Sequence, residues 1–129
     1  MTMIDHLSLG VSDIEKGCSF YNGLMTILGC DLLAQTEGFA AYGNGAPQFL
    51  IMLPSDGDNW SAGNGTHIAF VAKEKSAVDA AHRYAMEAGA KDNGAPGPRE
   101  AYPKADVYTA FVVDPFGNKL EFIHNGFAA

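Results

Sequence analysis

Three residues of the types that bind divalent metals stand at related positions in the chain. His6 and His67 each lie in a short, strand-like stretch, and Glu121 lies in another one near the end of the sequence. Imidazole nitrogens and a carboxylate oxygen together suit Zn, Fe, Mn, Ni or Co, and three protein ligands leave coordination positions open for a substrate. If the three side chains converge, the chain carries a metal site that could support catalysis.

The stretches that hold these residues predict that all three face the same way. In residues 4–11 and in residues 66–72, successive side chains are expected on alternate faces of a strand. His6 lies on the face opposite Leu7, Leu9 and Val11, and His67 lies on the face opposite Ile68, Phe70 and Ala72. This period of two is typical of a half-buried strand. In the closing stretch KLEFIH, the apolar residues on either side of Glu121 are the natural partners of a helix layer. The three candidate ligands therefore belong on the face away from the helices.

A helix is predicted after each histidine strand. Ser12 is the expected N-cap of the first helix, with Glu15 completing a capping box, and Gly29 is its expected end. Ser76 is the expected N-cap of the second helix, which Gly89 terminates.

The order of these elements indicates an internal duplication. His6 and His67 are 61 residues apart (67 − 6), and each is followed by a helix that ends about 22 residues later. Further strands are expected at residues 31–35, 39–42, 48–53, 107–114 and 119–124, and a loop with Pro96, Pro98 and Pro103 precedes the last two. Two amphipathic strand-helix units can also resemble each other by chance, but a histidine at the same point of each favours duplication.

The composition excludes several classes of function. The chain has 15 acidic and 8 basic residues and a formal net charge of -7. Nucleic acids require clustered Lys and Arg, and here these residues are dispersed, so no nucleic-acid partner is expected. No apolar run reaches about 18 residues and no signal peptide is evident. We expect a cytoplasmic protein without a membrane partner, with Cys18 and Cys30 as free thiols.

The stretches IDHLSLGVSD, GTHIAF and DPFGNKLEF, in this order and spacing, resemble the vicinal oxygen chelate superfamily. This superfamily includes glyoxalases, fosfomycin-resistance transferases, extradiol dioxygenases and bleomycin-resistance proteins, and the resemblance covers essentially the whole chain. It implies an α+β fold in which two βαβββ modules, residues 1–60 and 61–129 of a single domain, form a cupped mixed sheet with the helices on its outer face. It also implies a homodimer that can pair modules across subunits.

The resemblance implies that His6, His67 and Glu121 bind one divalent metal ion, which could be Zn, Ni, Mn or Fe. Glu121 is in addition a candidate catalytic base. Glyoxalases usually add a fourth carboxylate on the fourth strand, but here that slot falls on Leu50 or Met52, and neither is a good ligand for such a metal. This departure argues against true glyoxalase activity.

Five residues are candidate substrate contacts: Arg99, Tyr102, Tyr108, Met52 and Trp60. Arg99 could hold a carboxylate or phosphate, or could simply be solvated on a proline-stiffened loop. Trp60 could line the cup or cover the junction between the modules. Tyr102 and Tyr108 are candidates for a hydroxyl beside the metal.

The expected function is that of a metal-dependent, glyoxalase-like enzyme. It would be a lyase, an isomerase or a related transferase, acting on a small oxygenated substrate chelated at the metal. One alternative is a non-catalytic protein that sequesters a small molecule, in the manner of bleomycin-resistance proteins. Another is an extradiol dioxygenase-like oxygenase.

Overall fold

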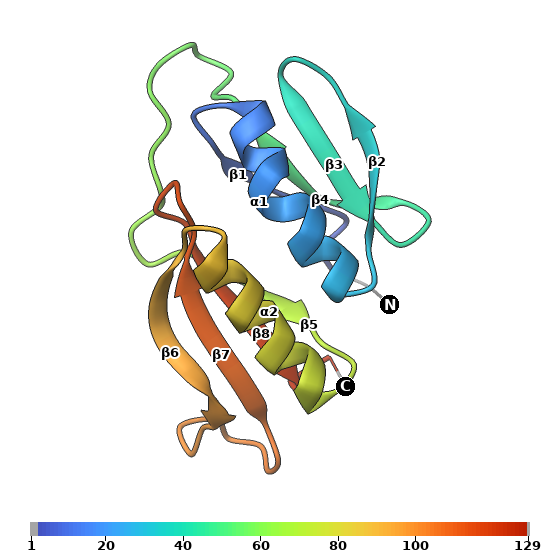
Figure 1. Cartoon of the computed structure of the whole chain (residues 1–129), viewed down its shortest axis with the longest axis vertical. Coiled ribbons are helices and arrows are strands. Elements are labelled where there is room, and N and C mark those ends of the chain that lie inside the picture. The colour runs from blue at the N-terminus through green and yellow to red at the C-terminus, as the bar shows by residue number, and fades with distance from the viewer. Residues whose placement is uncertain (1–2, 129) are drawn as a thin grey trace.

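The computed structural model describes residues 3–128, which form eight strands and two helices in two successive units (Figure 1). The first unit contains β1 (Leu7–Gly10), α1 (Ile14–Ile27), β2 (Asp31–Gln35), β3 (Phe39–Gly43) and β4 (Pro47–Met52). The second contains β5 (His67–Val71), α2 (Lys75–Glu87), β6 (Lys91–Pro98), β7 (Tyr108–Val113) and β8 (Lys119–His124). Each unit is a βαβββ module, so the predicted α+β fold is confirmed.

Each module has its own four-stranded mixed sheet. The strand order is β1-β4-β3-β2 in module 1 and β5-β8-β7-β6 in module 2. In both sheets the first strand pairs in parallel with the last one, and the remaining pairs are antiparallel. The two sheets are therefore built in the same way, as the duplication predicted.

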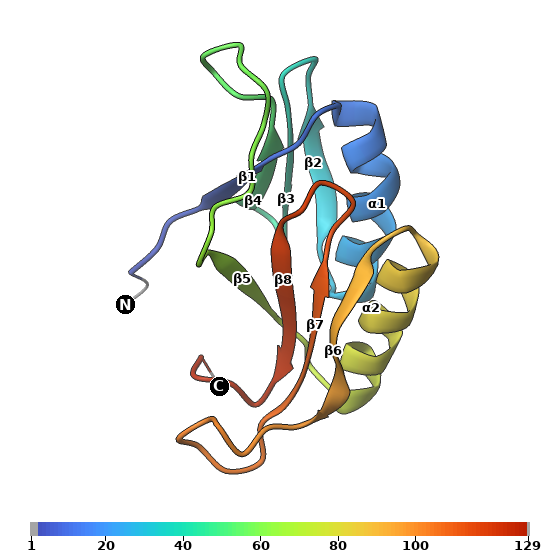
Figure 2. The same ribbon diagram turned by 90° about the vertical axis from the view of Figure 1, so that its left-hand side faces the viewer.

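Both helices lie on the same side of the sheets (Figure 2). The apolar alternation of the strands supplies the surface on which the helices pack, because side chains with period two all point to one face. Ile51, Leu120 and Phe122 are fully buried there, together with Leu24 of α1 and Val78 of α2. The opposite face of each sheet is called the open face below.

The modules are joined by polar contacts across their junction. The Tyr21 hydroxyl of α1 donates to the carboxylate of Asp114, which follows β7. The Asn118 side-chain amide donates to the Gly10 carbonyl oxygen (3.0 Å) and so links the turn after β7 to β1. Burial and the Asp114 carboxylate raise the pKa of Tyr21 well above its ordinary value, so this hydroxyl remains a donor at neutral pH.

Several predicted element ends are wrong by a few residues. Asp13, and not Ser12, caps α1, because its carboxylate Oδ1 accepts from the Lys16 N–H (2.9 Å). The N-cap position of α2 is Glu74 instead of Ser76, and it makes no side-chain capping bond. β1 begins at Leu7, one residue after His6.

The predicted proline loop contains a strand. Residues 91–98 form β6, the edge strand of module 2, whose register shifts twice as it pairs with β7. The glycines and prolines of this segment lack apolar alternation, and prolines are tolerated on edge strands and at bulges. No helix in the described residues is long and apolar enough to cross a membrane.

Candidate metal centre

His67 and Glu121 meet on the open face of module 2. The parallel register of β5 and β8 pairs His67 with Lys119 and Ala69 with Glu121, so these four residues point to one side of the sheet. The Nε2 atom of His67 lies 3.1 Å from Oε1 of Glu121. Two of the three predicted ligands are therefore adjacent, as the shared facing of their strands predicted.

The Glu121 carboxylate is buried and held in a fixed orientation. Glu121 is 1% exposed. Its Oε2 atom accepts hydrogen bonds from Thr109 Oγ1 (2.7 Å) and from the Tyr102 hydroxyl. A buried carboxylate is tolerated only when such partners replace its water. The two hydroxyls leave Oε1 directed at His67.

Tyr102 reaches this carboxylate from the loop between β6 and β7. Burial raises the pKa of Tyr102 to about 12, and its hydrogen bond with Glu121 adds to the shift. At neutral pH the phenol is therefore protonated and acts as a hydrogen-bond donor. Its ring also packs against Phe127, with 5.5 Å between the ring centroids.

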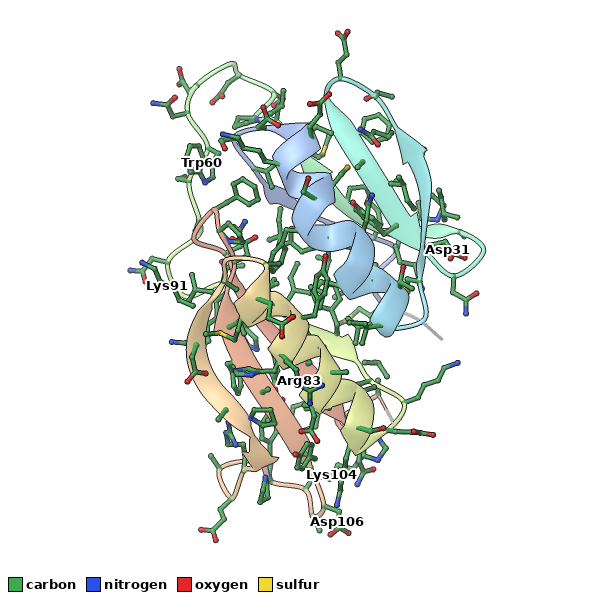
Figure 3. The ribbon with its side chains drawn as sticks, in the orientation of Figure 1. Asp31, Trp60, Arg83, Lys91, Lys104 and Asp106 are labelled. Carbon is green, nitrogen blue, oxygen red and sulfur yellow. The ribbon has the colours of Figure 1, made fainter. Side chains whose placement is uncertain are left out.

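A cavity of about 520 Å³ opens beside the pair. His67, Glu121 and Tyr102 form its polar part. Its apolar walls come from Ala69, Val71, Ile123 and Phe127. Lys104, which lies on the same loop as Tyr102 (Figure 3), donates from Nζ to the Gly126 carbonyl oxygen (2.5 Å). This bond links the loop to the C-terminal segment.

His6 does not join this pair within the chain. It precedes β1 and is exposed, and its Nδ1 atom lies 2.6 Å from Oδ1 of Asp5. Within residues 3–128, no group of three or more His, Cys, Asp or Glu side chains is close enough to hold a metal ion. The reason is topological, since β1 and β5 are edge strands of different sheets.

The fourth ligand slot can be identified from the strand registers. Ser8 pairs with Leu50 in module 1, as Ala69 pairs with Glu121 in module 2. Leu50 is therefore the counterpart of Glu121, and Met52 lies one alternation further along β4. Neither side chain offers an oxygen or nitrogen ligand.

Among the described residues, Tyr108, Trp60 and Arg99 make no hydrogen bond to His67 or Glu121. The Tyr108 hydroxyl donates to Asp79 Oδ1 of α2 (2.6 Å), so this ring is on the helix-facing side of β7. Trp60 donates from Nε1 to the Phe116 carbonyl (2.7 Å) and covers the junction between the modules (Figure 3). Arg99 donates to the carbonyl oxygens of residues 95, 97 and 98, which stabilises its own bulged segment.

Thr109 contacts Glu121, and the sequence did not predict this contact. It follows Tyr108 and so points to the opposite face of β7, toward Glu121. The only signal for it is the alternation of β7. In the sequence YTAFVV both faces of that strand are largely apolar, so the pattern does not show which residues face the helices.

A second, smaller cavity of about 320 Å³ lies between the modules. It is lined mostly by apolar residues that include Leu28, Tyr42, Phe49 and Phe70. Neither His67 nor Glu121 lines it, although Ala69 and Val71 line both cavities.

The family model of the Glyoxalase/Bleomycin resistance protein/Dioxygenase superfamily matches residues 3–122, and the chain belongs to this superfamily. Among solved structures, a glyoxalase/bleomycin resistance protein from Albidiferax ferrireducens is 29% identical with a TM-score of 0.87, and the match covers 97% of this chain and 100% of that one. The resemblance found in the sequence is thus confirmed.

Two more distant structures share the fold. A glyoxalase-related enzyme from Fulvimarina pelagi is 16% identical with a TM-score of 0.74, over 97% of this chain and 89% of its own. A glyoxalase/bleomycin resistance protein/dioxygenase from Alicyclobacillus acidocaldarius is 22% identical with a TM-score of 0.65, over 94% and 89%. No curated protein matches the chain.

Proposed function

We propose that this protein is a metal-dependent enzyme, a lyase, isomerase or related transferase, that acts on a small substrate with adjacent oxygens. Its centre would consist of His67 and Glu121 of one copy and His6 of a second copy in a homodimer. The observation that carries the proposal is the contact of 3.1 Å between His67 Nε2 and Glu121 Oε1, made by a carboxylate that is 1% exposed.

The donor chemistry of this pair fits a divalent transition metal. An imidazole nitrogen and a carboxylate oxygen are both common ligands of Zn, Fe, Mn and Ni. Tyr102 and Thr109 donate to the other carboxylate oxygen, which is the kind of outer hydrogen bonding that orients metal ligands. The pair alone gives two protein ligands, and the superfamily pattern calls for a third.

A second copy offers that third ligand. β1 and β5 are the outer strands of their sheets, so each has an edge without a strand neighbour in residues 3–128. Such edges are templates for pairing with another chain. Leu7 (40% exposed) and Val71 (60% exposed) add apolar surface at these edges. Pairing β1 of one copy with β5 of the other would bring His6 of the partner subunit to His67, twice in a symmetric dimer.

The chain's own residues would bind and orient the substrate. When bound, the metal supplies Lewis-acid stabilisation of an oxyanion on a substrate that chelates it. Glu121 is fixed by its two hydroxyl donors and is available at Oε1 as a ligand or as a proton acceptor. Tyr102 lines the same cavity, together with Val71 and Phe127.

Metal content of protein purified without chelator tests this proposal. Wild-type protein is expected to hold close to one transition metal per chain, and His67→Ala and Glu121→Gln are expected to lose it. His82→Ala is the matched control, because His82 Nε2 also contacts a carboxylate, Asp92 Oδ1, at 3.0 Å. A wild-type protein that takes up no Zn, Ni, Mn or Fe(II), or variants that keep their metal, would contradict the proposal.

A second candidate function is sequestration of a small molecule without chemistry. It is favoured by the apolar walls of the 520 Å³ cavity, which suit a ligand held mainly by burial. Metal-loaded protein that binds small vicinal diketones or hydroxyketones, but leaves them unchanged, would support sequestration over catalysis.

A further inference from the structure

Lys119 stands next to His67 on the open face of module 2. The two residues are paired in the parallel register of β5 and β8, so their side chains leave the sheet on the same side. The ammonium nitrogen of Lys119 lies 5.1 Å from the centroid of the Phe111 ring, and the His67 ring lies 6.1 Å from the same centroid. Lys119 is exposed, and its ammonium group makes no hydrogen bond or ion pair in the described part of the chain.

Positive charge collects at this end of the open face. Lys91 of β6 belongs to the same row across the sheet, since it pairs with Val113, which pairs with Lys119. The Arg99 guanidinium carbon lies 5.9 Å from the Phe111 centroid. By the strand registers, Glu121 is the only acidic residue of β5 to β8 on this face, although the whole chain has a net charge of -7.

The open face changes character along the strands. The first row holds Lys119 and His67, the second holds Glu121, and the third holds Ile123 and Val71. Successive rows are about 7 Å apart, because two residues of a strand span that distance. The cavity continues beyond the third row to Phe127. Lys119 thus lies beside His67 in the first row, and the apolar residues lie one row beyond Glu121.

We propose that the ligand of this centre carries a carboxylate that binds Lys119, about one row from its chelating oxygens, and an apolar body that lies against Val71, Ile123 and Phe127. Arg99 contributes to the local positive field, but its guanidinium is already held by three carbonyl oxygens. Lys119 is therefore the residue that contacts the anion. The inference rests on the proposed function for the position of the ligand's chelating oxygens. The binding of a carboxylate by Lys119 does not itself need a metal.

Binding of two matched probes in the presence of a chelator tests the inference. 3-Phenylpropanoate and 3-phenylpropanamide have nearly the same size and shape and differ in charge. We expect the acid-to-amide ratio of affinities, measured by NMR titration, to fall about two- to fivefold in Lys119→Gln, the loss expected for a solvated ion pair. Lys119→Arg keeps the charge and should keep most of the ratio. Lys16→Gln removes an exposed cation on α1 and should leave the ratio unchanged.

An acid-to-amide ratio equal in wild type and Lys119→Gln would overturn the inference, as would an equal loss in Lys16→Gln. These outcomes are distinguishable from failure of the proposed function. If the protein binds metal but its acid-to-amide ratio does not depend on Lys119, only this inference is wrong. If the protein takes up no metal but its acid-to-amide ratio depends on Lys119, the anion site stands and belongs to a ligand-binding protein.

Discussion

At the scale of single residues, Glu121 is the centre of the candidate site because its carboxylate is buried and fully partnered. Thr109 and Tyr102 donate to one oxygen, and His67 contacts the other. An unpartnered carboxylate at this depth would be strongly disfavoured. The two hydroxyls therefore have two roles, since they stabilise the buried group and also set the direction of the Oε1 atom that contacts His67.

We expect Tyr102→Phe and Thr109→Val each to weaken metal affinity by about 10- to 100-fold, the usual effect of removing an outer-shell hydrogen bond. Competition with a fluorescent chelator measures this affinity, and far-UV circular dichroism checks that the variants fold. Tyr84→Phe is the control, because the Tyr84 hydroxyl donates to the Ser19 carbonyl oxygen, on the helix side. Unchanged affinity in both site variants would show that the two hydroxyls do not orient the ligand.

At the scale of elements, a tight turn sets the register of β3 on β4, and β4 in turn pairs with β1, the strand that follows His6. Gly43 ends β3, where the pairing with β4 shifts before Pro47. A Cβ at Gly43 would collide with the Ala46 carbonyl oxygen, which belongs to the backbone and cannot rotate away. A Cβ at Gly38, on the other side of β3, would have no neighbour within 4 Å.

Gly43→Ala is therefore expected to destabilise the fold by about 2 kcal/mol or more, since the β3–β4 turn must move to accept the methyl group. Gly38→Ala should change the free energy of unfolding by no more than about 0.5 kcal/mol. Urea denaturation of both variants gives these values. Equal losses in the two would mean that backbone freedom, and not the collision with Ala46, explains the requirement at Gly43.

At the scale of the whole molecule, the proposed site belongs to two chains. β1 and β5 end their sheets, and His6 lies outside the contact between His67 and Glu121. A dimer that exchanges these edges would leave each copy folded as it is here, with the Tyr21 to Asp114 bond still joining its modules. Each complete site would then require both copies.

Mixing two inactive variants tests this arrangement. His6→Ala and His67→Ala homodimers should each bind little metal. A heterodimer of the two, purified with different affinity tags, should bind about half the wild-type amount, because one of its sites lacks both histidines and the other has both. A heterodimer that binds no more metal than either parent would show that His6 and His67 do not act across subunits.

The sequence by itself determined the residue types and the shared face of His67 and Glu121. Strand alternation is a local property with a period of two, so the common facing of His67 and Glu121 could be predicted without a structure. The same period left β7 ambiguous, because both of its faces are largely apolar, so Tyr108 was a candidate for the site and Thr109 was not. β6 was missed because edge strands need no alternation of apolar residues.

Only the tertiary structure decided which candidates meet. His67 and Glu121 converge because β5 and β8 pair in parallel within one sheet. His6 remains apart because its strand ends a different sheet, and the packing of the two modules is set by contacts between residues far apart in the sequence, such as Tyr21 and Asp114. Such long-range packing leaves no periodic signal in the chain, so the sequence alone could not show that one chain assembles two of the three predicted ligands.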